Sequence, residues 1–324
     1  MIVVFIIAIL LLLILAVCIY CFHTCFYAAN KKPLDPYSPL HGAQFLAVQD
    51  KIYASTKRLE AVPYESVTTK SFDGLTLAAQ YYHVADGAPV TIIFHGYRSM
   101  ALRDCTGGFG ISSRLGMNVL AIDQRAHGHS QGHVISFGIN ERRDCLSWIE
   151  YINNRFGADT PISLYGLSMG AATVLMAAAL PLPKNVVCIL ADCPYSSPAE
   201  IIKKVCKDEG YPPKLVYPLI RLAARVFGGF HLEESSAVEA VKEAKIPIQL
   251  FHGEDDRFVP CQMSHAIHEA SNGSTNLATF PNAGHGLSYM TMPTEYENTV
   301  FSFLASIPAL QPYVDKALFD KAAQ

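Results

Sequence analysis

A serine between two glycines carries the strongest chemical signal in the sequence. Residues 166–170 read G-L-S-M-G; a short apolar run, 161–165, precedes them, and 171–179 is rich in small helix-forming residues. A strand, a sharp turn and a helix in this order hold a serine hydroxyl in a strained position, and the glycines leave room for the turn. N–H groups at the start of such a helix point toward a developing negative charge. The segment predicts Ser168 as a nucleophile that attacks a carbonyl carbon.

A matching acid and base follow the serine in the chain. The apolar run 246–251 leads into H-G-E-D-D-R-F-V-P at 252–260, and His285 lies in a glycine-flanked loop after a β-rich run that ends at residue 280. A histidine can take the serine proton, and a carboxylate can orient that histidine. The run resembles the H-G-x-x-D-x-x-V-P pattern that carries a triad acid, and the Val-Pro pair at 259–260 then selects Asp256 and leaves Asp255 as the competing acid. We predict a triad of Ser168, Asp256 and His285.

Backbone donors for an oxyanion are expected at two places. The β-rich run 90–94 ends in H-G-Y-R at 95–98, a sequence typical of an oxyanion loop after a third strand. The N–H of Tyr97 would then lie beside the N–H of Met169, the residue after the serine. Two such donors stabilise the negative oxygen of a tetrahedral intermediate.

These pieces occur in the order serine, aspartate, histidine, and each follows a strand. In this the chain resembles the α/β-hydrolase superfamily, in particular its serine aminopeptidase-like and esterase-like branch, which includes membrane-anchored bacterial members. The resemblance covers about residues 65–305. It extends to A-I-D-Q-R-A-H-G-H-S at 121–130, which is similar to a D-x-R-G-H-G-x-S loop but has Ala126 in place of a glycine.

The resemblance implies a serine hydrolase that works through an acyl-enzyme and needs no cofactor. The same constellation serves carboxylesterases, lipase-like enzymes, aminopeptidases, thioesterases and acyltransferases, so the leaving group stays open. A hydrolase fold used only as a scaffold is disfavoured because all three triad members are present. His127, His129 and His133 raise the possibility of a metal, but their spacing matches no zinc pattern, and we predict no metal.

The rest of the chain predicts a fold that positions these residues. A hairpin with a turn at Asp73-Gly74 opens the domain, and strands then alternate with helices, which indicates a mostly parallel, doubly wound, eight-stranded sheet. Strands are expected at 67–71, 75–82, 90–94, 118–122, 161–165, 186–191, 246–251 and 276–280. Helices are expected near 100–115, 140–155, 169–180, 262–271 and 294–305.

Domain boundaries follow from composition. We expect a stalk or linker at 30–63, with an amphipathic stretch at 45–59, a hydrolase domain at 64–310 and a tail at 311–324. An insertion at about 195–244, after the sixth strand, is longer than one crossover helix needs and predicts a helical cap. Its apolar residues would either line an acyl pocket or pack the cap onto the core; examples are Tyr211, Leu215, Tyr217, Leu219 and Phe227.

The N-terminus predicts a single-span membrane anchor at 1–29. Residues 2–21 carry no charge, and some twenty helical residues span roughly 30 Å, the thickness of a bilayer core. A cleaved signal peptide is the alternative, but no Lys or Arg precedes the apolar run. Lys31 and Lys32 follow it, which favours a catalytic domain on the cytoplasmic side.

Composition narrows the partners. A net charge of −3 and no basic cluster argue against nucleic acid. The nine cysteines have no framework spacing and suit a reducing compartment. The anchor favours a small-molecule acyl substrate, a lipophilic ester of small or medium chain length. The oligomeric state is left open.

Overall fold

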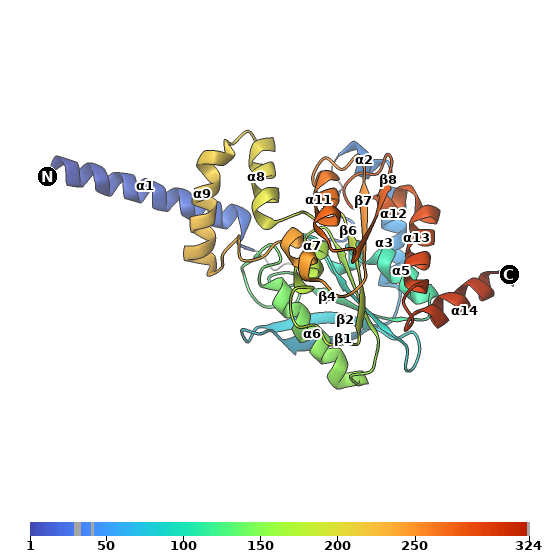
Figure 1. Ribbon diagram of the computed structural model, residues 1–324. Coiled ribbons are helices and arrows are strands. Elements are labelled where there is room, and N and C mark those ends of the chain that lie inside the picture. The colour runs from blue at the N-terminus through green and yellow to red at the C-terminus, as the bar shows by residue number, and fades with distance from the viewer. Residues whose placement is uncertain (29–33, 40–41, 323–324) are drawn as a thin grey trace.

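An eight-stranded sheet forms the centre of the molecule. The computed structural model describes residues 1–28, 34–39 and 42–322 (Figure 1). The strand order is β1-β2-β4-β3-β5-β6-β7-β8; β1 pairs antiparallel with β2, β2 pairs antiparallel with β4, and the other neighbours are parallel. The strands are β1 Glu65–Lys70, β2 Thr76–Tyr82, β3 Val90–Phe94, β4 Asn118–Asp123, β5 Ile162–Leu167, β6 Val186–Asp192, β7 Ile248–Gly253 and β8 Thr275–Phe280. The predicted mostly parallel sheet is confirmed.

Helices cover both faces of the sheet, because its central strands are apolar on both sides. All five residues of β3 are buried, as expected for a parallel strand between two helical layers. One face packs against α6 Glu141–Phe156, α7 Met169–Ala177, α10 Ala237–Glu243 and α11 Gln262–Ala270. The other packs against α3 Gln49–Glu60, α4 Ala101–Asp104, α5 Thr106–Arg114, α13 Pro293–Ala305 and α14 Gln311–Ala322. Short α12 Ser288–Thr291 precedes α13.

The insertion after β6 contributes three helical elements that lie away from the sheet. They are α8 Pro198–Asp208, α9 Pro213–Ala223 and a π-helical turn, η1 Ala224–Gly228. The next helix, α10, was included in the expected cap at 195–244. Its Ala237 and Val241 are buried in the core that α6 and α7 share with the sheet, so α10 belongs to the helical layer.

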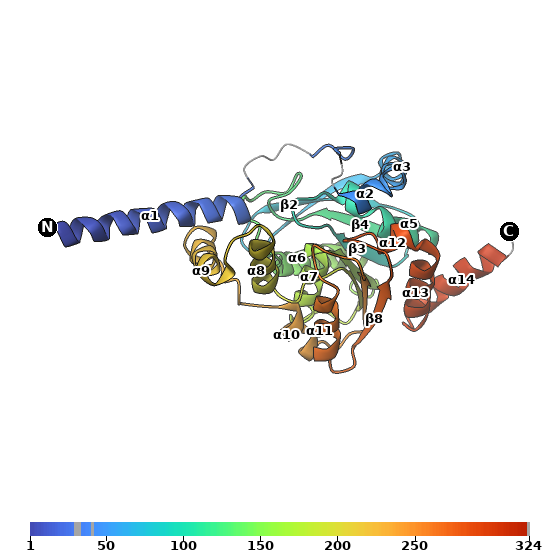
Figure 2. The same cartoon turned by 90° about the horizontal axis from the view of Figure 1, so that it is seen from above.

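The N-terminal helix α1, Ile2–Cys25, projects from the domain, and only its end is packed (Figures 1 and 2). It is the one helix among the described residues that is long and apolar enough to cross a membrane, and a signal sequence has the same character. Cys18, Cys21 and Phe22 are buried, and Phe26 just beyond is fully buried. Phe26 contacts the rings of Phe137 and Phe230, so the end of α1 forms part of the hydrophobic core.

Two terminal regions are more ordered than a stalk and a tail. The amphipathic stretch expected at 45–59 forms α2 Ala43–Leu46 and α3, and Leu59 is 2% exposed in the core. Residues 311–322 form α14, where Val314 is buried. Both segments pack onto the domain because their apolar side chains join the core on one face of the sheet. Asn30, Lys31 and Lys32 lie outside the described residues.

Candidate active site

The turn after β5 holds Ser168 in a strained backbone conformation. Its φ is 55° and its ψ is −114°, outside the regions that residues with a side chain prefer. The two glycines are required by close approach. A Cβ at Gly166 would lie 2.3 Å from the carbonyl oxygen of Gly170, and a Cβ at Gly170 would lie 2.1 Å from that of Phe94. The sequence G-L-S-M-G therefore permits a turn too tight for larger residues.

The structure brings together the three residues of the predicted triad. The Nε2 atom of His285 lies 2.9 Å from the Oγ of Ser168, and its Nδ1 lies 2.7 Å from Oδ2 of Asp256. When Nδ1–H donates to the carboxylate, Nε2 is left as the acceptor for the serine hydroxyl. Ser168 is 8% exposed and Asp256 is 6% exposed, so the chain of hydrogen bonds is largely shielded from water. This geometry allows a proton to move from serine to histidine.

Asp256, and not the adjacent Asp255, supplies the carboxylate that bonds to His285. Its Oδ1 accepts hydrogen bonds from the N–H groups of Phe258 and Val259, at 2.9 and 2.8 Å. Burial alone would raise the pKa of Asp256, but hydrogen bonds from His252 and His285 outweigh burial and hold that pKa well below its ordinary value. The carboxyl group is therefore ionised across the physiological range, whereas Asp255 is exposed on the turn.

The two predicted oxyanion donors come from two different parts of the fold. Met169 is the first residue of α7, and Tyr97 lies in the loop after β3. In the described part of the chain, no group accepts a hydrogen bond from either N–H. The loop around Tyr97 is fixed on both sides: the N–H of Gly96 donates to Asp104 Oδ2 at 2.8 Å, and that of Arg98 donates to His127 Nε2 at 3.0 Å. A free N–H between two bonded ones is available to a ligand.

Two buried histidines position this loop, and sequence reasoning did not assign them that role. The Nε2 of His95 accepts from the N–H of Gln124 at 3.1 Å, so its Nδ1–H donates to the carbonyl of Gly96 at 2.8 Å. The Nδ1 of His127 lies 2.9 Å from the Arg125 carbonyl. Burial lowers the pKa of His127 to about 3, so its ring is neutral and Nε2 is free to accept from Arg98. The only sequence signal for either residue was its place beside a recognised motif.

The loop 121–130 differs from its expected pattern at one strained position. Ala126 has a φ of 64°, in the left-handed region where a glycine costs nothing and alanine costs about 1 kcal/mol. The three histidines considered for a metal do not converge. His127 accepts from Arg98, His129 faces Asp123 at 3.3 Å, and Nδ1 of His133 lies 3.4 Å from the Ala28 carbonyl.

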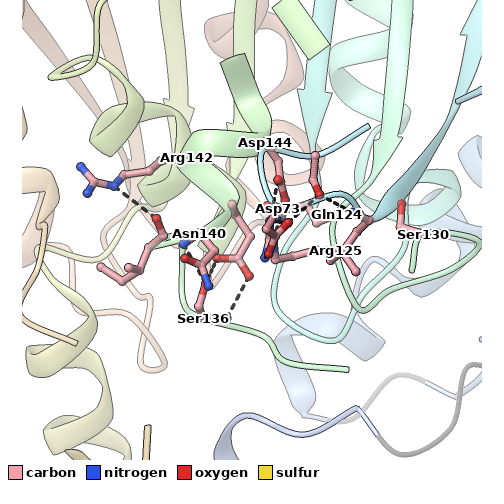
Figure 3. Close-up of polar contacts among 12 residues, drawn as sticks. Asp73, Gln124, Arg125, Ser130, Ser136, Asn140, Arg142 and Asp144 are labelled. Atoms are coloured by element: carbon pink, nitrogen blue, oxygen red, sulfur yellow. Dashed lines mark hydrogen bonds and ion pairs between the residues drawn. The ribbon is translucent and has the colours of Figure 1, made fainter. Parts of the chain in front are cut away.

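Arg125 anchors the same loop to its surroundings (Figure 3). Its side chain is 4% exposed, and its guanidinium makes two hydrogen bonds to Asp144, at 2.6 and 2.7 Å, and two to Asp73, at 3.0 and 3.1 Å. Burial raises the pKa of Asp144 to about 6, which still leaves its carboxylate ionised at neutral pH. Each carboxylate accepts two hydrogen bonds from the planar guanidinium, a geometry that fixes both partners. The segment that carries His127 is therefore held rigidly.

Two family models match the chain. A family model described as "alpha/beta hydrolase fold" matches residues 92–237, and the dienelactone hydrolase family model matches residues 216–301. Together with the sheet order and the serine turn, these matches decide the family. The chain belongs to the α/β-hydrolase superfamily.

Two curated proteins are related in sequence to this chain. "Uncharacterized protein YqkD" of Bacillus subtilis is 29% identical over 228 residues, 69% of this chain and 74% of its own. "Protein ABHD12B" of Homo sapiens is 25% identical over 201 residues, 58% of this chain and 51% of its own. The match with the human protein thus spans about half of that relative's length.

Solved structures show the same fold. The Pyrococcus furiosus esterase Pf2001 superposes with a TM-score of 0.62 at 23% identity, over 78% of this hydrolase and 95% of the esterase. Est1E of Butyrivibrio proteoclasticus, solved with ferulic acid, superposes with a TM-score of 0.57 at 20% identity, over 74% of this chain and all of that one. At these identities the likeness concerns the fold.

A cavity of about 610 Å³ opens beside the hydrolase's serine. Its lining includes Ser168, His285 and Tyr97, and also Phe45 of α2 and Ile52 of α3. None of the five cap residues expected to line an acyl pocket belongs to the lining. Tyr217 and Leu219 belong to the apolar cluster that α1, α8 and α9 share, and Leu215 is 71% exposed. The alternative expectation, that the cap residues serve packing, holds for Tyr217 and Leu219, because α1 and α8 occupy the space next to them.

A second buried carboxyl group lies at the end of β6. Asp192 lines the same cavity and is 1% exposed; its Oδ2 accepts from the Tyr296 hydroxyl at 3.0 Å, and Tyr296 in turn contacts Tyr165 at 2.9 Å. In the described chain its Oδ1 has no partner. Burial raises the pKa of Asp192 to about 7, so a large fraction of this carboxyl is protonated at neutral pH. Nothing in the sequence distinguished this aspartate from a solvated one.

A metal fits this site poorly. Donor atoms of Cys193, Asp256 and His285 lie within 4.8 Å of one another. Burial raises the pKa of the Cys193 thiol well above its ordinary value, so it is a weak ligand, and the His285 Nδ1 and the Asp256 carboxylate are already bonded to each other. The arrangement suits proton transfer better than cation binding.

Proposed function

We propose that this protein is a serine hydrolase that cleaves a carboxylic ester through an acyl-enzyme. The observation that carries the proposal is the chain of short hydrogen bonds from Ser168 through His285 to Asp256. The strained serine turn and the two free N–H groups beside it supply the remaining parts that acyl transfer requires.

The proposed chemistry proceeds in two halves. Nε2 of His285 accepts the Ser168 proton while Oγ attacks the ester carbonyl, and the negative oxygen receives hydrogen bonds from the N–H groups of Tyr97 and Met169. Protonated His285, held by the Asp256 carboxylate, gives the proton to the leaving alcohol as the C–O bond breaks. Water then takes the place of the alcohol, loses a proton to His285 and attacks the acyl group, which releases the acid and restores the serine.

The proposed substrate is a lipophilic ester of small or medium chain length. Apolar side chains dominate the cavity around the serine, including Phe45, Ile52, Leu287 and Met290. Pf2001 is an esterase, and Est1E was solved with ferulic acid bound. Both are in keeping with ester cleavage on this fold. Aminopeptidase, thioesterase and acyltransferase chemistry would use the same three residues, and only the acceptor or leaving group would differ.

We further propose that α1 stays on the mature protein as a membrane anchor, with the catalytic domain on the cytoplasmic side. Burial of Cys18, Cys21 and Phe22 against the domain supports retention, because a cleaved signal peptide would leave that apolar contact empty. The orientation depends on Lys31 and Lys32 and on the positive-inside rule. Carbonate extraction of the full chain from membranes tests the anchor, and a mature chain that begins near Asn30 would refute it.

The hydrolase proposal is tested by labelling with a fluorophosphonate probe, which reacts with an activated serine. Ser168→Ala is expected to abolish labelling and to lower kcat by a factor on the order of 10⁴ or more. The matched control is Ser306→Ala, at the end of α13 and away from the cavity. Ser99 is not used because it lines the cavity. Labelling that survives in Ser168→Ala would refute the assignment.

A substrate panel then separates the possible leaving groups. We expect p-nitrophenyl esters to be cleaved faster than aminoacyl amides, because the cavity offers apolar surface for an acyl chain. Faster cleavage of aminoacyl amides than of any ester would move the protein to the aminopeptidase class.

A further inference from the structure

The outer face of α9 and η1 is both apolar and basic. Leu215, Leu222 and Val226 are 71%, 43% and 60% exposed. They follow one another at spacings of seven and four residues, which places them on one side of a helix. A large apolar side chain in water gains free energy when it is covered, so three along one face indicate a surface that meets an apolar partner.

Cations line the same helix beside the apolar face. Lys214, Arg221 and Arg225 repeat the spacing of seven and four, one position earlier, and all three are exposed. Residues 213–228 contain no Asp or Glu, although the whole chain has a net charge of −3. Arg221 has one acidic neighbour, Glu233, at 3.7 Å. An apolar face bordered by Lys and Arg is typical of helices that lie in the headgroup region of an anionic membrane.

The position of α9 relative to α1 points to the same partner. α9 crosses the C-terminal half of α1, the part nearest to the domain (Figures 1 and 2). Cys18 Sγ lies 3.7 Å from the Leu219 carbonyl, and the rings of Phe22 and Phe227 lie 5.7 Å apart. From Ile2 to Phe22 a helix rises roughly 30 Å, the thickness of the hydrocarbon core. If α1 crosses a bilayer, α9 is at the level of the headgroups.

We infer that the outer face of α9 and η1, defined by Leu215, Leu222, Val226 and the adjacent Lys214, Arg221 and Arg225, docks on the anionic membrane surface from which α1 emerges. This inference rests on the proposed membrane span of α1 and is independent of the proposed ester hydrolysis. The docking gives the insertion after β6 a role outside the substrate cavity. It holds the domain against the membrane at a second point besides α1, so the tethered domain has a fixed orientation.

Tryptophan quenching in vesicles tests the docking without any activity measurement. The full chain has one tryptophan, Trp148, which is fully buried and supplies a constant background. Leu222→Trp puts a fluorophore on the α9 face, and Leu318→Trp puts one at a similarly exposed position on α14, at the opposite end of the molecule (43% and 48% exposed). Both variants are reconstituted in vesicles that contain phosphatidylglycerol and lipids brominated on their acyl chains.

We expect a blue-shifted emission and several-fold stronger quenching for Leu222→Trp than for Leu318→Trp. Equal quenching of the two variants, in chains that stay in the vesicles after a carbonate wash, would overturn the docking alone. Loss of the chain from the vesicles would overturn both the docking and the membrane span. A blue shift without bromolipid quenching would show that another copy of the chain covers the face, and would also overturn the inference.

The cations provide a second readout. Replacing Lys214 and Arg225 by glutamine in the Leu222→Trp chain is expected to reduce quenching in anionic vesicles to the level found in vesicles of phosphatidylcholine alone. Unchanged quenching in the anionic vesicles would overturn the preference for anionic lipid.

Discussion

At the residue scale, the adjacent Asp255 and Asp256 have very different surroundings. Oδ2 of Asp256 faces His285 at 2.7 Å, whereas Asp255 is exposed and contributes only backbone atoms to its turn. Asp256→Asn is expected to lower kcat by roughly 10⁴-fold, because an amide cannot hold the histidine tautomer or stabilise its charged form. Asp255→Asn is the matched control and should change kcat less than a few-fold. Kinetics with one ester checks both variants, and a reversed order would contradict the proposed acid.

Asp192 is expected to make stability depend on pH. Its pKa is raised to about 7 by burial, against about 3.9 in an unfolded chain, so between these values the folded state binds the proton more tightly. Stability contributed by this carboxyl group is therefore present below about pH 4 and is lost as the pH rises to about 7. Asp192→Asn removes this loss, so the variant should gain stability relative to the wild type as the pH increases.

Urea unfolding of both proteins at pH 5 and pH 8 checks this expectation. The comparison between variant and wild type removes the contribution of other groups, such as His127, whose lowered pKa has the opposite effect on the wild type at acid pH. A difference in unfolding free energy that is the same at both pH values would contradict a protonated Asp192.

At the element scale, the cavity beside the serine is bounded by α2 and α3 and not by the insertion. Phe45 and Ile52 line it, whereas α8 and α9 contribute no lining residue. This arrangement arises because α2 and α3 lie beside the acid loop, where Gln44 donates to the Asp255 carbonyl, while the insertion packs against α1. The elements that select the acyl group are therefore expected to be those before the first strand.

Phe45→Ala should change the chain-length preference of the enzyme. Removing the ring enlarges the cavity, so the optimum for p-nitrophenyl esters should move toward longer acyl chains, each added methylene being worth about 0.8 kcal/mol of binding at most. Leu215→Ala on the exposed face of α9 is the control and should leave the optimum unchanged. A shift with Leu215→Ala and none with Phe45→Ala would return the acyl pocket to the cap.

At the scale of the whole molecule, α1 is joined to the candidate active site. The Tyr97 hydroxyl donates to the Cys25 carbonyl at 2.8 Å, and the Arg98 guanidinium donates to the Thr24 carbonyl at 2.9 Å. Residues after the helix continue this contact, since the N–H of Ile135 donates to the Phe26 carbonyl at 2.8 Å. The end of α1 thus supports the loop that carries a proposed oxyanion donor.

Shortening the chain should therefore have two different effects, depending on where it begins. A chain that begins at Val17 keeps Phe22 and Phe26, whereas one that begins at Lys31 loses both. Complete burial of one such ring is worth about 1.5–3 kcal/mol, so the shorter chain should unfold several degrees lower and hydrolyse esters more slowly. Thermal unfolding and kcat of the two chains check this, with Phe26→Ala in the full chain as a single-residue comparison. Equal melting temperatures would contradict a structural role for the end of α1.

The sequence alone determined what depends on local pattern. Alternating strands and helices predicted the parallel sheet, because a helix between two strands forms the crossover connection that parallel strands need. The likeness of residues 252–260 to the acid loop of α/β-hydrolases predicted Asp256 as the acid, because the Val-Pro pair fixes the register. The glycines at 166 and 170 predicted the tight turn at Ser168, because only residues without a Cβ fit there.

The tertiary structure decided what depends on residues far apart in the chain. The burial that raises the pKa of Asp192, the contacts that make His95 and His127 supports of the Tyr97 loop, and the packing of Phe26 into the core all arise from long-range contacts. Long-range contacts also explain why the segment expected as a stalk contributes Phe45 and Ile52 to the lining of the cavity. Its helices are amphipathic in sequence, but only the folded domain supplies the apolar surface that determines where they pack.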